Sequence, residues 1–313
     1  MNSVSKSSSD ERVWAALAHG SALVFMLGLF IPVIVWSTQR RKSNFAAFHA
    51  LQALGYQALT FLVWLLAGLA LYVLLFASML PLLTSADRAG LDSQLFGLVF
   101  SFLPILLMFG LYGLYFLFSL IAVVAVLLGK EFRYPLMGKR LARYLGYQPG
   151  ADASAAPLNA EHEDRWLAAM GHITAIVTLW GLLLPLVTWI TEKNRSRFLR
   201  FQSLQALIYQ GIGTVSYFIV TAFYMLGIFG VFAATIVAGV SGNTDFMLAG
   251  LTIFFFSMLI MLGYFLALPI YHILSQWAAW RILHGHDYRY PILGRLIADR
   301  MSSAPGPVPA GTG

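Results

Sequence analysis

The chain has 313 residues, of which 59% are hydrophobic and only 11% are charged, and its mean hydropathy is +0.75. This composition lies far outside the range of soluble globular proteins, and the lack of cysteine excludes disulfides and thiolate metal sites. The net charge of +7 does not point to a nucleic-acid partner, because membrane topology explains where the basic residues lie.

Six stretches without charged residues are each long enough to cross a bilayer, which takes about 20 apolar residues. They cover residues 13–39, 43–86, 93–129, 166–191, 201–244 and 246–280. The sequence therefore predicts an all-α, polytopic membrane protein. Its first residues carry an acidic pair and no small-residue cleavage pattern, so we expect no cleaved signal peptide.

The sequence contains a tandem duplication. Residues 10–57 align without a gap to residues 163–210, with 20 identities in 48 positions. A second match, at an offset of 156, pairs Arg133-Tyr134-Pro135 with Arg289-Tyr290-Pro291. Internal repeats of this kind are common in membrane proteins, where each copy forms one structural unit.

The duplication divides the chain into five parts. Residues 12–147 and 163–300 are predicted to be membrane repeats, each with a short hairpin or re-entrant segment, two long spans and a basic interfacial helix. The other segments are polar or rich in Pro, Gly and Ser. They are predicted to form a polar N-terminus (1–11), an acidic flexible linker (148–162) and a disordered tail (301–313).

The first apolar segment of each repeat decides the topology. A basic cluster follows each one, at residues 40–42 and 193–200, whereas the connections at 86–92 and near Asn243 carry more acidic than basic charge. If each first segment crossed the membrane fully, the second repeat would be inverted and its basic cluster would lie outside. If each segment enters and leaves on one side, every basic cluster lies inside, as the positive-inside rule favours.

We therefore expect each first segment to be a hairpin, bent near Gly28–Pro32 and near Gly181–Pro185. Irregular backbone at membrane depth is tolerated only inside protein, so each bend should pack against the later spans. The resulting prediction is a multi-pass protein of the bacterial plasma membrane, with its termini and basic loops in the cytoplasm.

A stripe of aromatic residues and glutamine opens the next helix of each repeat, followed by the long spans. The stripe consists of Phe45, Phe48, Gln52 and Tyr56 in the first copy, and of Phe198, Phe201, Gln205 and Tyr209 in the second. Spaced at i, i+3, i+7 and i+11, these residues share one helical face. The phenylalanines are expected at the lipid headgroups. The glutamines either line a polar path or bond neighbouring helices. Each stripe meets either its own copy or a different protein, and the duplication favours the copy.

Each repeat ends on an Arg-Tyr-Pro motif, formed by Arg133, Tyr134 and Pro135 and by Arg289, Tyr290 and Pro291. Proline disfavours a helical conformation in the residue before it, so each tyrosine should end a span and anchor it at the interface. Apolar and basic residues then separate on opposite faces of residues 136–145. This pattern predicts an interfacial helix on an anionic leaflet, which makes the lipid bilayer the first expected partner.

Two histidines occupy equivalent positions in the apolar segments. Arg12 and His19, like Arg165 and His172, lie seven residues apart on one helical face. They could form a proton relay or line a substrate path, because ionisable groups inside membranes are often functional. Alternatively, each histidine could be neutral and bond across a helix interface. The apolar stretches contain no acidic residue to complete a relay, which favours the structural reading.

The sequence offers no catalytic, cofactor-binding or metal-binding motif. His284 and His286 superficially resemble a metal cluster, but the first repeat has Gly129-Lys130-Glu131 in that place. No phosphate loop, nucleophile elbow or HExxH motif is present. We therefore expect no enzymatic activity and no cofactor.

Three further motifs recur as a set: Ser196-Arg197-Phe198-Leu199-Arg200-Phe201 with Gln205-Ala206, Glu11–His19, and Tyr288-Arg289-Tyr290-Pro291. Together they resemble the Tic-twenty family, which includes a membrane subunit of the chloroplast inner-envelope import translocon. Bacterial relatives of unknown function look nearest. The resemblance implies four spans with both termini on one side, in agreement with the charge pattern. The first copy departs from it, with Asn44 and Ala47 where the second has Arg197 and Arg200.

Two hypotheses about function follow. The first is a non-enzymatic scaffold or accessory subunit of a membrane complex, including one that translocates proteins, with other membrane proteins as partners. The alternative is a small-solute or proton-coupled transporter or channel, with its path at the repeat interface near His19 and His172.

Overall fold

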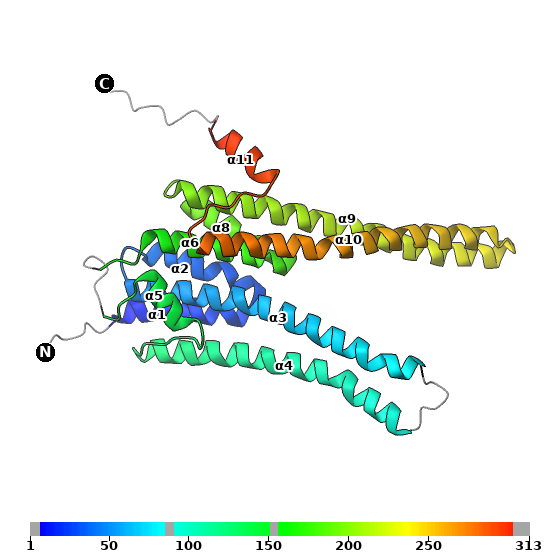
Figure 1. The fold of residues 1–313 in the computed structure, drawn as a ribbon, viewed down its shortest axis with the longest axis horizontal. Helices are drawn as coiled ribbons and strands as arrows, with labels where there is room; N and C mark the ends of the chain where they lie inside the picture. Colours follow the sequence, from blue (N-terminus) through cyan, green and yellow to red (C-terminus); the bar gives the residue numbers. More distant parts are fainter. Residues whose placement is uncertain (1–6, 85–90, 151–155, 303–313) are drawn as a thin grey trace.

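The computed structural model describes residues 7–84, 91–150 and 156–302, and throughout these residues the regular elements are helices (Figure 1). The first repeat contains α1 (Ser9–Gly20), η1 (Ser21–Phe30), α2 (Ile31–Gln39), α3 (Asn44–Thr84), α4 (Leu91–Leu127) and α5 (Gly138–Leu145). The second contains α6 (Ala160–Ile173), η3 (Thr174–Val177), α7 (Thr178–Gly181), α8 (Leu183–Glu192), α9 (Arg197–Ser241), α10 (Asp245–Leu283) and α11 (Leu293–Ser302). The predicted all-α architecture of two helical repeats is confirmed.

The two repeats point in the same direction. In Figure 1 the long pairs α3–α4 and α9–α10 extend from the end of the molecule where both termini and the short helices lie. Five helices of the described residues are long and apolar enough to cross a membrane, or six if the bent pair formed by Ala160–Gly181 and Leu183–Glu192 counts as one span. An inverted second repeat would place its long pair on the opposite side, so this arrangement agrees with the topology that the charge pattern favours.

The first segment of each repeat folds back on itself. Phe25 has a φ of 53° and its counterpart Thr178 a φ of 38°, and the bend in the second repeat measures 118°. Although Ser9–Gln39 is long enough to span by length and composition, α2 packs back against α1. With 12 residues, α1 is about 18 Å long, which is well short of a hydrocarbon core of about 30 Å. The predicted hairpins are present, with the break a few residues before Gly28 and Gly181.

A glycine makes each turn possible by close backbone contact. A Cβ added at Gly28 would lie 1.9 Å from the carbonyl oxygen of Ser21, and one added at Gly181 would lie 2.0 Å from that of Thr174. Contacts this short cannot be accommodated without moving the backbone. These glycines, rather than the prolines that follow them, set the separation of the two arms of each hairpin.

Replacing Gly28 with alanine is expected to destabilise the protein by at least about 1–3 kcal/mol, because the added methyl group overpacks the turn. Gly68→Ala provides the matched control, since a Cβ there meets nothing within 4 Å. In a helix interior that substitution should stabilise by about 0.5–1 kcal/mol. Unfolding of the purified variants by SDS titration in mixed micelles measures both changes. Equal stability of the two variants would contradict the role of Gly28.

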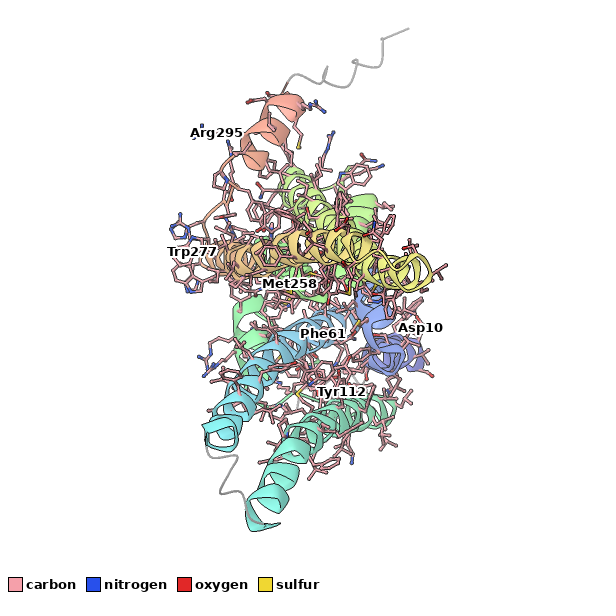
Figure 2. All side chains as sticks on the ribbon, turned by 90° about the vertical axis from the view of Figure 1, so that its right-hand side faces the viewer. Asp10, Phe61, Tyr112, Met258, Trp277 and Arg295 are labelled. Carbon is pink, nitrogen blue, oxygen red and sulfur yellow. The ribbon has the colours of Figure 1, made fainter. Side chains whose placement is uncertain are left out.

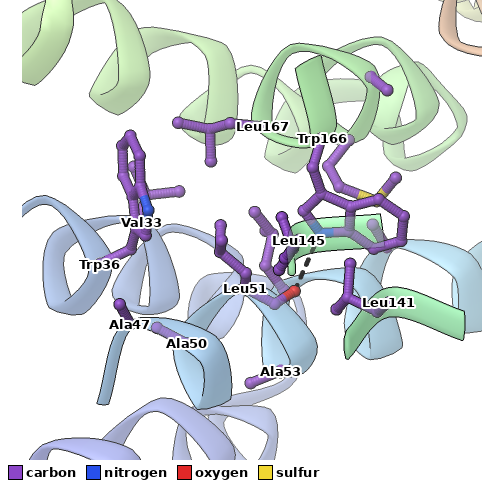
Figure 3. Close-up of a cluster of buried hydrophobic side chains, with 14 of the residues drawn as sticks. Val33, Trp36, Ala47, Ala50, Leu51, Ala53, Leu141, Leu145, Trp166 and Leu167 are labelled. Carbon is purple, nitrogen blue, oxygen red and sulfur yellow. Dashed lines mark hydrogen bonds between the residues drawn. The ribbon is translucent and has the colours of Figure 1, made fainter. Parts of the chain in front are cut away.

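The repeats join through their short helices. Helix α6 packs against α3, and α8 packs against α2 and η1. Figure 3 shows the apolar part of this interface, where Trp166 and Leu167 meet Leu51, Leu141 and Leu145. Towards the far end, α3–α4 and α9–α10 separate into two pairs (Figures 1 and 2). The two repeats therefore contact each other at the end of the molecule that contains the short helices, and not at the far ends of the long pairs.

A buried charge cluster closes the same interface. Arg40 lies 3.6 Å from Glu163, 3.7 Å from Asp164 and 3.4 Å from Glu192, and its guanidinium stacks over the ring of Trp36. The Trp36 indole donates to Glu163 over 2.8 Å. Arg195 also pairs with Glu192, at 3.2 Å. The two glutamates are almost wholly buried, so these hydrogen bonds and cations keep them from being uncompensated charges.

Two helices begin earlier in the chain than the predicted repeat boundaries. Helix α1 begins at Ser9, inside the predicted polar N-terminus (1–11), and Ser8 caps it. Helix α6 begins at Ala160, inside the predicted linker (148–162), and Asn159 caps it. Residues 151–155 of that linker lie outside the described residues, as do residues 303–313 of the predicted tail. Each capping side chain accepts a hydrogen bond from a free backbone N–H of the first turn.

Candidate functional site

Each repeat encloses a small polar core beneath its hairpin. In the first, Nδ1 of His19 lies 3.1 Å from the hydroxyl of Tyr134, and Nε2 lies 3.0 Å from Nδ1 of His49. In the second, Nδ1 of His172 lies 3.1 Å from the hydroxyl of Tyr290. Both central histidines are completely inaccessible to solvent. The hairpin helices α1 and α6 thus supply a histidine that meets the Arg-Tyr-Pro tyrosine of the same repeat.

The second repeat fixes the tautomer of its histidine. Nε2 of His172 lies 3.2 Å from the side-chain oxygen of Gln202, whose amide group donates to the carbonyl of Tyr288. Since that oxygen only accepts, Nε2 must carry the proton and Nδ1 must accept from Tyr290. In the first repeat His49 takes the position of Gln202. The same tautomer of His19 then donates to His49, whose own Nε2 has no partner among the described residues.

Gln52 and Gln205 hold the Arg-Tyr-Pro segments in place. The Gln52 amide donates to the carbonyl of Phe132 over 3.1 Å, and its oxygen accepts from the backbone N–H of Tyr134 over 3.3 Å. Gln205 makes the same two bonds, to Tyr288 and Tyr290. Both glutamine side chains are therefore engaged in clamping the irregular backbone of their own repeat.

The tyrosines of the two stripes complete these cores by stacking. Tyr56 lies between Tyr134 and Tyr115, with ring centroids 3.7 and 5.5 Å away, and its hydroxyl donates to the carbonyl of Tyr115. Tyr209 makes the equivalent contacts with Tyr290 and Tyr271, and donates to the carbonyl of Tyr271 over 2.8 Å. Each stripe thus packs within its own repeat, so the expectation that the two stripes face each other is wrong.

The prediction that Tyr134 and Tyr290 anchor at the lipid headgroups is also wrong, because both side chains are buried inside the protein. Only 2% of Tyr134 and 3% of Tyr290 are exposed. Burial raises the pKa of both hydroxyls well above the usual value, so they remain protonated donors for the histidines. Phe48 likewise stacks on Tyr147 inside the core, with centroids 4.0 Å apart, rather than at the headgroups. The spans end before the motif, α4 at Leu127 and α10 at Leu283, so the proline does not end the helix as the sequence predicted. Each tyrosine lies in the loop that follows and turns inward, where its hydroxyl meets a histidine.

The arginines lie apart from the polar cores. Arg12 donates to the carbonyl of Ser7 and lies over Gly129, at the end of α4. Arg165 pairs with Glu161 and with Asp287, and its guanidinium lies over the ring of Phe198. Although each shares a helical face with its histidine, the two turns between them separate a partly buried cation from a fully buried imidazole. Their contacts fasten α1 and α6 to the loops that follow the long pairs.

Neither a metal site nor a polar channel is evident in the described parts of the chain. No group of three or more His, Asp or Glu side chains there could hold a metal ion, and His284 bonds instead to the carbonyl of Trp280. A cavity of about 470 Å³ between α3 and α4, lined by Pro104 and Tyr112, and one of about 460 Å³ beside Tyr209 have almost wholly apolar walls. The two histidines lie within their own repeats rather than at the repeat interface.

Replacing Gln52 with leucine is expected to destabilise the first repeat by about 1–3 kcal/mol for each backbone group left unpaired. The Phe132 carbonyl and the Tyr134 N–H would both lose their partner. Gln148→Leu serves as control, because Gln148 is an exposed residue outside the helices. Thermal unfolding in detergent compares the two variants, and an unchanged midpoint for Gln52→Leu would show that the clamp does not hold the motif.

Comparison with known protein families finds a model that covers both repeats. The model of the magnetosome magnetite crystal formation protein family matches residues 10–141 and again residues 163–297. The two matched regions coincide with the two repeats, which supports the duplication independently of the alignment within the chain. Searches of curated proteins and of solved structures find no match.

Proposed function

Because the chain belongs to the magnetosome magnetite crystal formation protein family, we propose that it is a non-enzymatic membrane scaffold that takes part in forming magnetite crystals. The observation that carries this proposal is the use of the buried polar side chains. His19, Gln52 and their counterparts bond to the Arg-Tyr-Pro segment of their own repeat. Such side chains stabilise a fixed shape, whereas a transport path needs polar groups that a passing solute can reach.

The family's description also bears on location. We propose that the chain works in the magnetosome membrane, a refinement of the plasma membrane expected from the sequence alone. Helices α1, α5 and α11 share one end of the molecule (Figure 1), and the basic charge of α5 and α11 supports a cytoplasmic location for that end under the positive-inside rule. Reporters fused near Gln148 and Gly242 should read cytoplasmic and non-cytoplasmic, respectively, and the opposite result would contradict this orientation.

The proposal is tested by deleting the gene in cells that form magnetite and measuring crystal size and number by electron microscopy. We expect deletion to change one or both, and the wild-type chain to restore them. Unchanged crystals would contradict participation in crystal formation. If crosslinking in native membranes instead recovered subunits of a protein-translocation complex, the role implied by the Tic-twenty resemblance would take precedence.

The substitution His49→Gln distinguishes the scaffold hypothesis from the transporter hypothesis. This substitution copies the second repeat, where Gln202 already accepts from the equivalent histidine. The bond of His19 is kept, but a titratable group is lost from the His19–His49 pair. A scaffold carrying His49→Gln should restore normal crystals. A correctly folded variant that fails to restore them would favour a proton-coupled transporter with its path through this pair.

A further inference from the structure

A groove in the first repeat is filled by the second. Trp166 of α6 lies between α3 and α5, where its indole N–H donates to the carbonyl of Leu51 over 3.0 Å (Figure 3). The groove is shaped for this ring, since a Cβ on Gly55 would lie 2.3 Å from the indole. Leu141 and Leu145 of α5 are buried on its other side. Docking of the repeats thus depends on a slot with small residues on its α3 wall.

The equivalent groove in the second repeat, between α9 and α11, is lined by arginines as well as apolar side chains. Its volume is about 470 Å³, and it is lined by Arg200, Leu204, Ile208, Leu296, Ile297 and Arg300, among others. Arg200 replaces Ala47 of the first repeat, and Ile208 replaces Gly55. Both changes oppose the docking of a further tryptophan-bearing helix, because isoleucine occupies the ring's position and an arginine would have to be buried.

The groove borders an apolar cavity on α9. Leu293 lines both spaces, and beyond it lies the cavity of about 460 Å³ lined by Tyr209, Ile212 and Tyr271. Its walls are almost entirely apolar, and the neighbouring faces of α9 and α10 expose apolar side chains such as Ile212 and Ile270. The two neighbouring spaces, called the path below, have Arg200 and Arg300 at one end and an apolar slot at the other.

We propose that this path binds an anionic phospholipid. Its phosphate lies between Arg200 and Arg300, and one acyl chain runs along Leu204 and Ile208 towards the tyrosine-lined cavity. Guanidinium groups match phosphate oxygens in charge and geometry. The site lies at the basic end of the molecule, next to the leaflet whose surface charge attracts arginine. A second copy of the chain would instead need the small residues that only the first repeat provides.

The site is tested on the full chain, purified and reconstituted in nanodiscs that contain phosphatidylglycerol and phosphatidylcholine. Native mass spectrometry of the released protein measures which lipid remains bound. We expect phosphatidylglycerol to be retained selectively. In the double variant Arg200→Ala/Arg300→Ala that preference should fall by about 30-fold, the factor expected when two basic residues facing an anionic lipid are removed.

Two further variants control the experiment. Lys139→Ala/Arg140→Ala removes two exposed charges from α5, whose groove is already filled, and measures the general attraction of this basic helix to anionic lipid. Its loss of lipid preference should be smaller than that of Arg200→Ala/Arg300→Ala, and an equal loss would overturn the proposed site. Ile208→Trp should block the path for the acyl chain and reduce retention without removing charge. The proposal is overturned if phosphatidylcholine is retained equally, if the double variant keeps its preference, or if Ile208→Trp retains lipid normally. Dimers that form through this face would likewise overturn it, in favour of a second copy as occupant.

Discussion

Replacing Arg40 with alanine is expected to destabilise the protein by about 3–5 kcal/mol, which is the usual effect of removing one partner from a buried ion pair. Glu163 and Glu192 are 3% and 0% exposed, and Arg40 is the cation that pairs with both. Without Arg40, the two carboxylates would either stay buried without the cation that offsets their loss of hydration, or reach water by separation of the repeats. Either outcome weakens the interface formed by α2, α6 and α8.

The duplication supplies a matched control for this prediction. Lys193 occupies the position equivalent to Arg40, but its ammonium only stacks over Trp189, at 4.6 Å. Lys193→Ala should therefore change stability by less than about 1 kcal/mol. SDS titration of both variants gives the difference, and a crosslink between cysteines introduced on α2 and α8 reports docking of the repeats. Similar losses in the two variants would show that the charge cluster does not hold the interface.

Replacing Trp166 with alanine, as a separate single variant, is expected to lower the free energy of unfolding by about 3–5 kcal/mol, as is typical for deleting a buried aromatic side chain. Trp166 is 9% exposed and fills the slot above Gly55. Its loss would leave a cavity between Leu141 of α5 and α3, in the centre of the interface between the repeats. Because α6 carries both Trp166 and His172, loosening this helix should also disturb the second polar core.

Val13 is the position in the first repeat that corresponds to Trp166, and 55% of it is exposed. Val13→Ala is therefore expected to change stability by less than about 0.5 kcal/mol. Thermal unfolding of the two variants in the same detergent makes the comparison. If Trp166→Ala were as stable as Val13→Ala, the apolar interface shown in Figure 3 would not be what joins the repeats.

The arrangement of the two repeats explains why equivalent residues meet different neighbours. The second repeat uses α6 to cover α3 of the first, whereas among the described residues no equivalent helix covers α9 in the same place. Trp166 is accordingly buried and Val13 exposed, while Ala47 is buried and Arg200 exposed. Sequence differences between the copies thus mark the faces on which the molecule is not symmetric, and these faces carry the interface and the proposed lipid site.

Much of the polar core could be predicted from sequence. The duplication picked out His19, Gln52 and Tyr56 with their counterparts, and the structure brings each set together around the Arg-Tyr-Pro segment. Glu163 and Glu192 were not recognised, although both lie next to candidate residues or basic clusters. The alignment of the repeats does contain a signal for Glu192, because it takes the position of the neutral Gln39. An acidic residue among basic ones at a membrane boundary needs a partner, so this difference indicates an ion pair.

The membrane environment, the repeats and their common direction follow from the sequence, because hydropathy, internal similarity and the placement of charge are all properties of local stretches of the chain. How these units meet depends on the tertiary structure. Whether Tyr134 faces lipid or His19, and whether an aromatic stripe meets its copy or its own repeat, depends on contacts between segments about 80 to 115 residues apart. Local patterns do not encode such contacts, since a helix with polar and aromatic residues on one face can satisfy them against several neighbours.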